Sequence, residues 1–512
     1  MIFTLDGRLR LTDCPAALRR ALMEELTIPN PAYTRAAYLG LPTYSIPREL
    51  LLYEVQSNEL ILPRGMANDV WHRRPKDTQK RDAMTLCPAP AWPPGSIRLR
   101  SYQQKAADAV LASKTPQGVL VMPCGAGKTE TGLYLIRAIG QPALWIAHTN
   151  DLVLQAAERA KARLGLTDGQ IGILNGTQKR IGTHLTVATV QTLYHMELDD
   201  LAGRIGTVIV DECQHVVANP ANAQMFNAVL GCLPARYRYG LTATPARGDG
   251  LEHTIHMILG DTIAQVDQQV LVDTGSTVIP KVQPVLTQFS YTPGPREQMH
   301  IDTARLRRCL AADTARNTRI VRMIAQDALH GETVLALGCG LDILETMCRA
   351  LHSQSDFAAA GLNAHFICGA TKAADRTAAL RELKDPACPA RVLFATYQLA
   401  KEGLDIPCAG RLYLVQPVRD KVSVQQAVGR IMRPAPGKTT ALVYDFVDNN
   451  VPACRSQYAA RRRVYKQLNA EILRKQHYER LFLPQQPGKH LRCRAGSHRR
   501  QAAGRPLHCH PE

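Results

Sequence analysis

The sequence predicts two tandem α/β domains, each a parallel sheet covered by helices on both faces, with a small α+β domain before them and a basic helical extension after them. Three observations predict this architecture. From Ile97 onward, short apolar or β-branched segments alternate with helical patterns, and they do so in two successive runs. Polar motifs follow several of these segments directly, at the edge where parallel sheets bind ligands. A glycine-rich turn joins one segment, which begins at Val119, to a helix.

The expected domain boundaries are 1–97 for the N-terminal domain, 98–275 and 276–450 for the two α/β domains, 451–483 for the basic helical extension and 484–512 for a disordered basic tail. In the N-terminal domain, the Asp6-Gly7 pair between two apolar segments predicts a β-hairpin. A second hairpin is expected from Leu50–Val55 and Glu59–Leu62. The proline-rich segment Cys87–Ser96 predicts a linker, because proline lacks a backbone donor and stiffens the chain.

The two α/β runs are assigned as follows. Strands of the first domain are expected at Val119–Met122, Ala143–Ala147, Leu185–Thr189, Thr207–Val210 and Tyr239–Thr242. Strands of the second domain are expected at Thr333–Leu337, His365–Ile367, Arg391–Ala395, Arg411–Val415 and Ala441–Asp445. Helices are expected between them at Gly132–Ile139, Asp151–Leu164, Asp342–His352, Ala373–Leu383 and Val422–Met432.

Composition narrows the class of partner. The 512 residues carry a net charge of +18, which favours a polyanionic partner, with nucleic acid first. No segment approaches the run of about 18 apolar residues that a membrane span requires. The fourteen cysteines form no CxxC pair, and charges interrupt the N-terminal segment where a signal peptide would be apolar. We therefore expect reduced thiols, no membrane partner, and a cytoplasmic protein that is nucleoid-associated if it comes from a bacterium or a phage.

The segment VLVMPCGAGKT, residues 119–129, has the pattern of a phosphate-binding loop. An apolar strand pattern runs into a glycine-rich turn, and Lys128 and Thr129 open a helix. Backbone N–H groups freed by Gly125 and Gly127, the helix N-terminus and the Lys128 charge would face an anion, and Thr129 could hold Mg²⁺. Taken alone, the pattern also fits a glycine turn that caps a helix, because Met122 stands where the full motif has glycine.

Two further patterns supply groups that phosphoryl transfer needs. Asp211 and Glu212 end a predicted strand, where they can hold a metal and orient an attacking water. An Asp-Glu pair is also common at a solvated strand end, but its place in the same sheet as the loop favours the functional interpretation. Arg430 and Arg433 lie at i, i+3 on one helical face, and guanidinium groups match phosphates. A basic surface helix is the alternative, and the apolar residues around both arginines favour an interface.

From about Leu99 to Asp448 the sequence resembles a superfamily 2 helicase, a family with two RecA-like domains. Eight segments match the family's motifs in order, namely LRSYQ (99–103), PCGAGKT (123–129), AHTNDLVLQ (147–155), VATVQTL (187–193), DECQH (211–215), LTATP (241–245), ATYQLAKEGLDIP (395–407) and QQAVGRIMRP (425–434). The segments GLTATPARGDG and EGLDIP look most like the xeroderma-pigmentosum-B type and related phage and restriction-type helicases. Residues 1–97 resemble, more weakly, a small N-terminal module of some such phage proteins.

The resemblance implies ATP and Mg²⁺ as cofactors and movement along a nucleic acid, usually 3′ to 5′. Thr129 and Asp211 would hold the metal, and Glu212 would be the catalytic base. Gln214 stands where the type usually has histidine, so altered coupling is expected rather than lost hydrolysis. The nucleotide-binding residues implied are Gln103, Pro123, Cys124, Gly125, Ala126, Gly127, Lys128, Thr129, Gly403 and Asp405. Those completing the site from the second domain are Gln426, Arg430 and Arg433, and those coupling ATP state to DNA contact are Gln214, Thr242 and Thr244.

Three functions stay open at this stage. The first is an ATP-driven DNA helicase or translocase, and the second is an RNA helicase or the motor subunit of a restriction-type complex. The third is a nucleic-acid clamp that binds ATP without hydrolysing it, which the intact Lys128, Asp211 and Glu212 argue against. The sequence shows no convincing nuclease constellation. Residues 1–97 are equally compatible with a damage- or junction-sensing role and with a structural platform.

Overall fold

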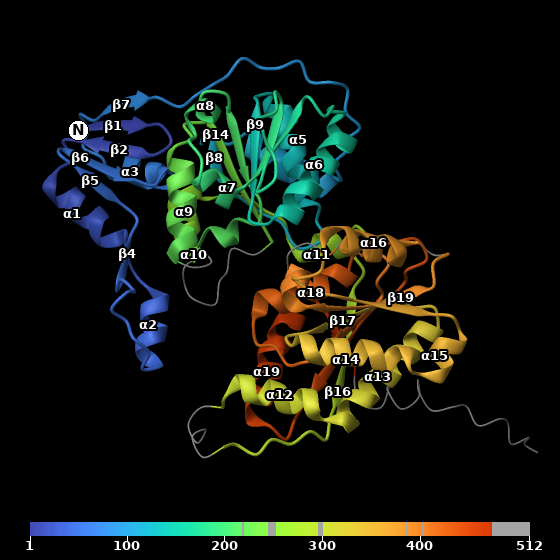
Figure 1. Cartoon of the computed structure of the whole chain (residues 1–512). Helices are drawn as coiled ribbons and strands as arrows, with labels where there is room; N and C mark the ends of the chain where they lie inside the picture. Colours follow the sequence, from blue (N-terminus) through green and yellow to red (C-terminus); the bar gives the residue numbers. More distant parts are fainter. Residues whose placement is uncertain are drawn as a thin grey trace, which may run out of the picture. The chain divides into compact units, whose positions relative to one another are not determined.

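The computed structural model describes residues 1–217, 220–243, 252–294, 301–385, 387–401, 404 and 406–473 (Figure 1). The predicted site residues Thr244, Gly403 and Asp405 and the predicted tail 484–512 lie outside these ranges. None of the helices in the described ranges combines the length and the apolar character that crossing a bilayer requires.

The N-terminal module contains a five-stranded sheet of order β5-β6-β2-β1-β7 among its described residues. Its elements are β1 Ile2–Leu5, β2 Leu9–Thr12, α1 Ala16–Glu25, β3 Thr27–Pro29, α2 Pro31–Tyr38, β4 Glu49–Leu51, β5 Glu54–Gln56, β6 Glu59–Leu62, the 3₁₀ turn η1 Arg64–Met66, α3 Ala67–Arg73 and β7 Gln79–Asp82. Strands β1 and β2 form the predicted hairpin, with Leu5 opposite Leu9. The predicted strand Leu50–Val55 is wrong as one element, because β4 pairs with β3 whereas β5 pairs with β6.

Two buried arginines join this module to the first α/β domain. The Arg64 side chain donates to the Gln117 side chain (Nε to Oε1, 2.6 Å) and to the Ala235 carbonyl (Nη1, 2.7 Å). Arg238 donates from Nη2 to the carbonyls of Leu230 and Leu233 at 2.7 and 2.9 Å and of Gly7 at 3.1 Å. Burial lowers the pKa of Arg64 to about 10 and that of Arg238 well below its usual value. The module therefore shares an interior with the first domain.

The first α/β domain contains an eight-stranded sheet of order β11-β10-β12-β9-β13-β14-β8-β15 among the described residues, parallel except for β11. Its elements are α4 Ser101–Leu111, β8 Gln117–Val121, α5 Lys128–Ile139, β9 Ala143–Ala147, α6 Asn150–Leu164, β10 Ile171–Leu174, β11 Lys179–Arg180, β12 Leu185–Thr189, α7 Val190–Tyr194, α8 Asp199–Ala202, β13 Thr207–Val210, the 3₁₀ turn η2 Cys213–Val217, α9 Pro220–Gly231, β14 Tyr237–Thr242, α10 Glu252–Leu259, β15 Thr262–Gln265 and α11 Gln268–Asp273. The five predicted strands are confirmed, and β10, β11 and β15 extend the sheet beyond them.

Alternating residues of the strands fill the two faces of this sheet. Val119 and Val121 enter a core shared with α7, α9, α10 and the N-terminal module. Leu120 and Met122 enter the opposite core, which α4, α5 and α6 cover. This period of two is what an extended strand imposes on its side chains. The proline-rich segment lies against the second face, where the Trp92 indole donates to the Gly140 carbonyl at 3.1 Å.

The second α/β domain contains a seven-stranded, fully parallel sheet of order β18-β19-β17-β20-β21-β16-β22 among the described residues. Its elements are β16 Pro280–Leu286, α12 Thr303–Ala312, α13 Thr314–Leu329, β17 Val334–Gly338, α14 Leu341–His352, α15 Ser355–Ala359, β18 Asn363–Ile367, α16 Ala373–Lys384, β19 Ala390–Thr396, α17 Tyr397–Lys401, β20 Arg411–Leu414, α18 Lys421–Ile431, β21 Ala441–Val447, α19 Pro452–Gln467 and β22 Glu471–Ile472. The five predicted strands are present, and β16 opens the domain from a segment that the sequence left unplaced.

Residues 451–473, the described part of the segment expected to be an appended basic extension, are built into the second domain. Val464 and Tyr465 of α19 are buried in that domain's core, and β22 pairs with β16. The fully buried Arg461 side chain donates three hydrogen bonds to the Asp445 carboxylate, at 2.7 to 3.1 Å. The burial of Arg461 could not be predicted from the sequence, because it lies in a run of three arginines and its neighbours Arg462 and Arg463 are exposed.

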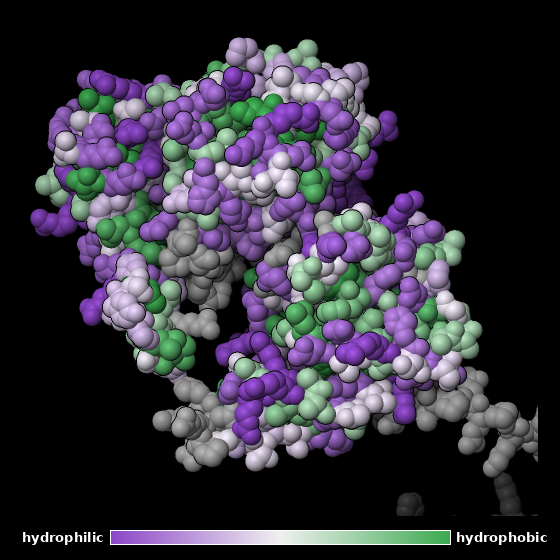
Figure 2. All heavy atoms as spheres, in the orientation of Figure 1, coloured by the Kyte–Doolittle hydropathy of each residue, from purple (hydrophilic) through white to green (hydrophobic). Residues whose placement is uncertain are grey.

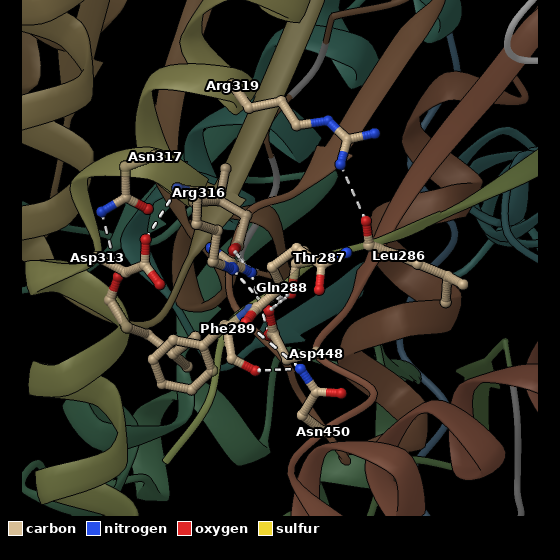
Figure 3. Close-up of polar contacts among 12 residues, drawn as sticks. Leu286, Thr287, Gln288, Phe289, Asp313, Arg316, Asn317, Arg319, Asp448 and Asn450 are labelled. Carbon is tan, nitrogen blue, oxygen red and sulfur yellow. Dashed lines mark hydrogen bonds and ion pairs between the residues drawn. The ribbon is translucent and has the colours of Figure 1, made fainter.

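A buried ion pair between Arg316 and Asp448 joins elements of the second domain that lie far apart in the chain. Figure 3 shows Arg316 of α13 pointing at Asp448, which follows β21. The guanidinium donates to both carboxylate oxygens, at 2.7 and 3.2 Å, and to the Val415 carbonyl at 2.8 Å. The Thr287 hydroxyl, just after β16, donates to the same carboxylate at 2.5 Å. This network ties the ends of β16 and β21 to α13.

Candidate functional site

A cavity of about 480 Å³ lies at the phosphate loop and is lined by residues of both α/β domains. From the first domain the lining residues are Arg100, Pro123, Gly125, Gly127, Lys128, Thr129, Leu152, Gln155, Arg159, Arg163, Asp211 and Glu212. From residue 276 onward they are Ser276, Pro407, Arg430, Arg433 and Pro434. The structure therefore brings the predicted lysine, carboxylates and arginines, up to 305 positions apart in the chain, to one site.

The phosphate loop has the backbone that its glycines allow. Gly125 and Gly127 have φ values of +83° and +81°, in the left-handed region that favours glycine. Gly127 is the N-cap of α5, so the free amides of the first helical turn open toward the loop. A Cβ atom at Gly127 would come within 2.2 Å of the Gln103 side chain, which leaves no space for a larger residue.

The two carboxylates differ in environment. The Glu212 carboxylate lies 3.2 Å from the Lys128 ammonium and accepts a 2.8 Å hydrogen bond from Gln214. Burial would raise the pKa of Glu212, but these partners outweigh it and hold that pKa at about 2. Burial, followed by the charge of Glu212, raises the pKa of Asp211 to about 7. A cation bound at Asp211 would oppose that elevation, because its positive charge stabilises the ionised carboxylate.

Glu212 also has an unusual backbone. Its φ of +47° lies in the left-handed region, where a residue with a Cβ atom costs about 1–2 kcal/mol. The conformation turns the chain sharply from β13 into η2, and the Glu212 amide donates to the Asp211 carboxylate at 2.9 Å. Strained backbone of this kind clusters at functional sites, where it aims a side chain.

A hydrogen-bonded relay connects the carboxylates to the next strand. The Gln214 amide nitrogen donates to Glu212, and its oxygen accepts from the Thr242 hydroxyl at 2.6 Å. Both Gln214 and Thr242 are buried. Two of the three residues that the resemblance implied for coupling, Gln214 and Thr242, are therefore hydrogen-bonded to each other. Thr244, the third predicted coupling residue, lies outside the described residues.

Of the described residues that the sequence predicted for nucleotide binding or for completing the site, four are not among the residues that line the cavity, namely Gln103, Cys124, the buried Ala126 and Gln426. The Gln103 amide accepts from the Arg100 backbone at 2.8 Å and donates to the Ala126 carbonyl at 2.7 Å, so it braces the loop. Its contact with a nucleotide base stays a prediction. The Gln426 side chain is buried, and its Oε1 has no hydrogen-bond partner among the described residues. Cys124 faces helix α18, where a Cβ at Gly429 would meet the Cys124 Cβ at 2.6 Å.

Several residues that line the cavity were not predicted from the sequence, although their helical spacing could have indicated them. Gln155, Arg159 and Arg163 lie at i, i+4 and i+8 on α6 and form one stripe along its cavity side. Thr149 caps this helix by accepting from the Leu152 amide at 3.4 Å. The spacing is visible in the sequence, but the segment that resembles a helicase motif, 147–155, ends at Gln155.

Lys438 holds two of the second-domain residues that line the cavity, although it does not line the cavity itself. Its ammonium donates to the carbonyl of Arg433 at 2.9 Å and to that of Pro407 at 2.9 Å. Both of those residues line the cavity, whereas Lys438 lies in a separate hollow. Burial lowers the pKa of Lys438 to about 8. Lys438 therefore holds Pro407, the last residue of the segment 395–407, close to Arg433 of the segment 425–434.

Two family models match the chain. Residues 96–247 match the type III restriction enzyme res subunit, and residues 326–435 match the helicase conserved C-terminal domain. A Halobacterium salinarum protein named putative DNA 3′-5′ helicase Rad25 is 29% identical over 66% of this chain and 52% of its own length. The Mycobacterium tuberculosis DNA 3′-5′ helicase XPB is 27% identical over 71% of this chain and 63% of its own length.

The fold has counterparts among solved structures. S. cerevisiae Dbp5 bound to RNA and ADP BeF3 superimposes with a TM-score of 0.54 at 12% identity, covering 81% of this chain and 95% of that one. At this identity the likeness concerns the fold alone, which is the pair of RecA-like domains. The chain spans about half the length of the first curated relative that it matches. The chain belongs to the superfamily 2 helicases and is related to their xeroderma-pigmentosum-B (XPB) type.

Proposed function

We propose that the chain hydrolyses ATP and couples hydrolysis to movement along DNA, or to its unwinding, in the 3′ to 5′ direction. The observation that supports this most is the composition of the cavity. Six cationic side chains line it, namely Arg100, Lys128, Arg159, Arg163, Arg430 and Arg433, against the two carboxylates of Asp211 and Glu212. A site so rich in cations suits a triphosphate, and the carboxylates supply a metal holder and a base.

Each residue has a defined task in this proposal. The loop amides and Lys128 hold the phosphates, and Glu212, oriented by Gln214, accepts a proton from the attacking water. The hydroxyl of Thr129 and the carboxylate of Asp211 are the oxygen donors that Mg²⁺ prefers, and both line the cavity. When bound, Mg²⁺ supplies positive charge to the phosphate oxygens. The guanidinium of Arg433 stabilises the transition-state charge from the second domain.

Coupling follows from the position of the cavity. A nucleotide that contacts Lys128 on one side and the arginines on the other draws the two domains together, and hydrolysis releases them. If both domains hold the backbone of a strand, each closure advances the chain along it. Such contacts to phosphates are independent of sequence and weaken with salt.

The experiment that tests the proposal is a screen of ATP hydrolysis. The chain is assayed alone and with single-stranded DNA, duplex DNA, branched DNA and single-stranded RNA, and translocation is followed on strands labelled at either end. We expect DNA to raise the hydrolysis rate and the 5′ end of the strand to be reached. Stimulation by RNA alone would favour an RNA helicase, and hydrolysis without any stimulation would contradict a motor.

The relay through Gln214 gives a specific expectation. In Gln214→Leu the bonds to Glu212 and Thr242 are both lost, and a hydrogen bond to a charged group contributes about 1.5–3 kcal/mol. We expect DNA stimulation of ATP hydrolysis to fall about tenfold. The rate is measured with saturating DNA, with Gln104→Leu on α4 as the matched control. An unchanged stimulation would show that the relay carries no coupling.

The contacts of Lys438 give a second specific expectation. Lys438→Met removes the donor that holds the Arg433 and Pro407 carbonyls, and a displacement of about 1 Å in a reacting group can cost about 100-fold in rate. We expect a 10- to 100-fold lower kcat with little change in the KM for ATP. Lys384→Met, on the rim of the same hollow, is the control. Equal rates in both variants would contradict this positioning role.

A further inference from the structure

The N-terminal module carries an apolar tip on a short stalk. Strands β3 and β4 form the stalk, and residues 31–48 form the tip, which includes helix α2 (Figure 1). Four of the fourteen exposed large apolar side chains in the described residues fall within seven positions of this tip. Their exposed fractions are Tyr38 72%, Leu39 52%, Leu41 55% and Tyr44 92%. Figure 2 shows white and green spheres over this part of the surface.

The stalk holds the tip in a fixed shape. The buried Asn30 closes its base, because its amide group donates to the Pro47 carbonyl at 2.8 Å and accepts from the Ala32 backbone at 3.0 Å. The Asn30 backbone donates to the Arg48 carbonyl at 2.9 Å. The inner stalk residue Ile28 is part of the core that the module shares with the first α/β domain. The tip is therefore joined to that domain through packed structure.

The chemistry of the tip selects its partner. Residues 26–48 contain no aspartate or glutamate and two arginines, so no charge on the tip repels a polyanion. Arg48 lies over the Tyr33 ring with its carbon 5.5 Å from the centroid, and it donates to the Tyr33 hydroxyl at 2.9 Å. An element that carries exposed aromatic rings and arginine, without acidic residues, has the composition of surfaces that stack on nucleic-acid bases. The exposed tyrosine rings at Tyr38 and Tyr44 would otherwise have a cost in solubility.

We propose that residues 31–48 form a stacking element that contacts unpaired bases of the nucleic acid, with Tyr44 and Tyr38 as its stacking rings. This inference rests on the proposed function, because it assumes a nucleic acid that the motor domains engage. Because the tip is joined to the first domain, it moves with that domain when the cavity closes. The element would therefore keep separated strands apart while the motor domains advance.

The test compares the full chain with Tyr44→Ser, the Tyr38→Ser/Tyr44→Ser double variant and Tyr44→Phe. Leu329→Ser, which removes an exposed apolar side chain at the end of α13, is the matched control. Affinity for a fluorescent single strand and for a blunt duplex is measured without nucleotide over a series of salt concentrations. A stacked base contributes about a 5- to 150-fold effect on affinity.

We expect Tyr44→Ser to bind the single strand at least fivefold more weakly and the double variant more weakly still. The salt dependence should stay unchanged, because stacking involves no phosphate charge. Tyr44→Phe should bind like the parent chain, and blunt-duplex affinity should not change. Single-strand affinities equal to that of Leu329→Ser, or an equal loss on blunt duplex, would overturn the inference, and the latter would point to a contact with the duplex backbone.

ATP hydrolysis with saturating single strand separates this inference from the proposed function. If the tip variants keep the stimulation of the parent chain but lose unwinding of a forked duplex, the stacking role is supported. If they unwind as fast as the parent chain, the stacking role fails while the motor stands. A parent chain that no nucleic acid stimulates would refute the motor, and the stacking element with it.

Discussion

Glu212→Gln should abolish ATP hydrolysis, with an expected fall in kcat of about 10²–10⁴-fold, while ATP still binds. The glutamine keeps the size of the side chain but cannot accept a proton from water. It also loses the 3.2 Å ion pair with Lys128. The measurement is the steady-state rate of phosphate release at saturating ATP and DNA, together with the affinity for a fluorescent ATP analogue.

The matched control for this variant is Glu158→Gln on the exposed side of helix α6, which should hydrolyse ATP at the parent rate. A Glu212→Gln enzyme as fast as the parent would remove Glu212 from the mechanism. A rate that falls together with analogue binding would instead indicate that the lost ion pair disordered the phosphate loop.

Arg316→Leu should destabilise the second α/β domain by about 3–5 kcal/mol. The side chains of Arg316 and Asp448 are 1% and 0% exposed, so removal of the arginine leaves a carboxylate that neither water nor a second cation can reach. Among the side chains that the structure describes, the Thr287 hydroxyl would remain as a hydrogen-bond donor to this carboxylate. The measurement is the urea concentration at the unfolding midpoint, followed by circular dichroism.

Arg319→Leu is the matched control, because Arg319 lies one turn nearer the middle of the same helix, is exposed and donates to the Leu286 carbonyl at 3.0 Å (Figure 3). Its midpoint should stay close to that of the parent chain. Replacing Asp448 as well, in Arg316→Leu/Asp448→Leu, should recover part of the stability, since no unpaired charge then stays buried. Equal shifts for Arg316→Leu and Arg319→Leu would contradict this account of the pair.

The elements that the sequence predicted correctly are those with strong local signals. Strand β8, the glycine turn and Lys128 lie close together in the chain, and Asp211 directly follows the last residue of β13. The Asp6-Gly7 pair fixes its hairpin for the same reason. Each of these features depends on neighbours in the chain.

The features that the sequence did not reveal depend on partners far away in the chain. Strand β7 is exposed and polar (QKRD) and pairs with β1 only because the chain returns to that edge. The burial of Arg64 and Arg238 depends on carbonyl groups up to 231 positions away. From sequence alone an arginine is expected to be exposed to water, because arginine is rarely buried. Only the packed structure shows where backbone carbonyls replace water as its hydrogen-bond partners.

The sequence could predict which residues form the site, but not the contacts that position them. The motifs named the lysine, the carboxylates and the arginines, whereas the bracing of the loop by Gln103 and the role of Lys438 need coordinates. The helix stripe at Arg159 and Arg163 lay just beyond the last matched motif residue. Periodicity in α6 would have revealed it, since residues four apart share a face.

The central claim is that one nucleotide is held between Lys128 of the first domain and the arginines of the second. The most direct test is the DNA-stimulated rate of ATP hydrolysis of Arg433→Ala, compared with Arg462→Ala on the exposed face of α19. We predict a loss of about 100-fold or more for Arg433→Ala, with affinity for the ATP analogue changed much less, and a parent-like rate for Arg462→Ala. Parent-like hydrolysis by Arg433→Ala and by Arg430→Ala would show that the second domain does not complete the site, and would contradict the account.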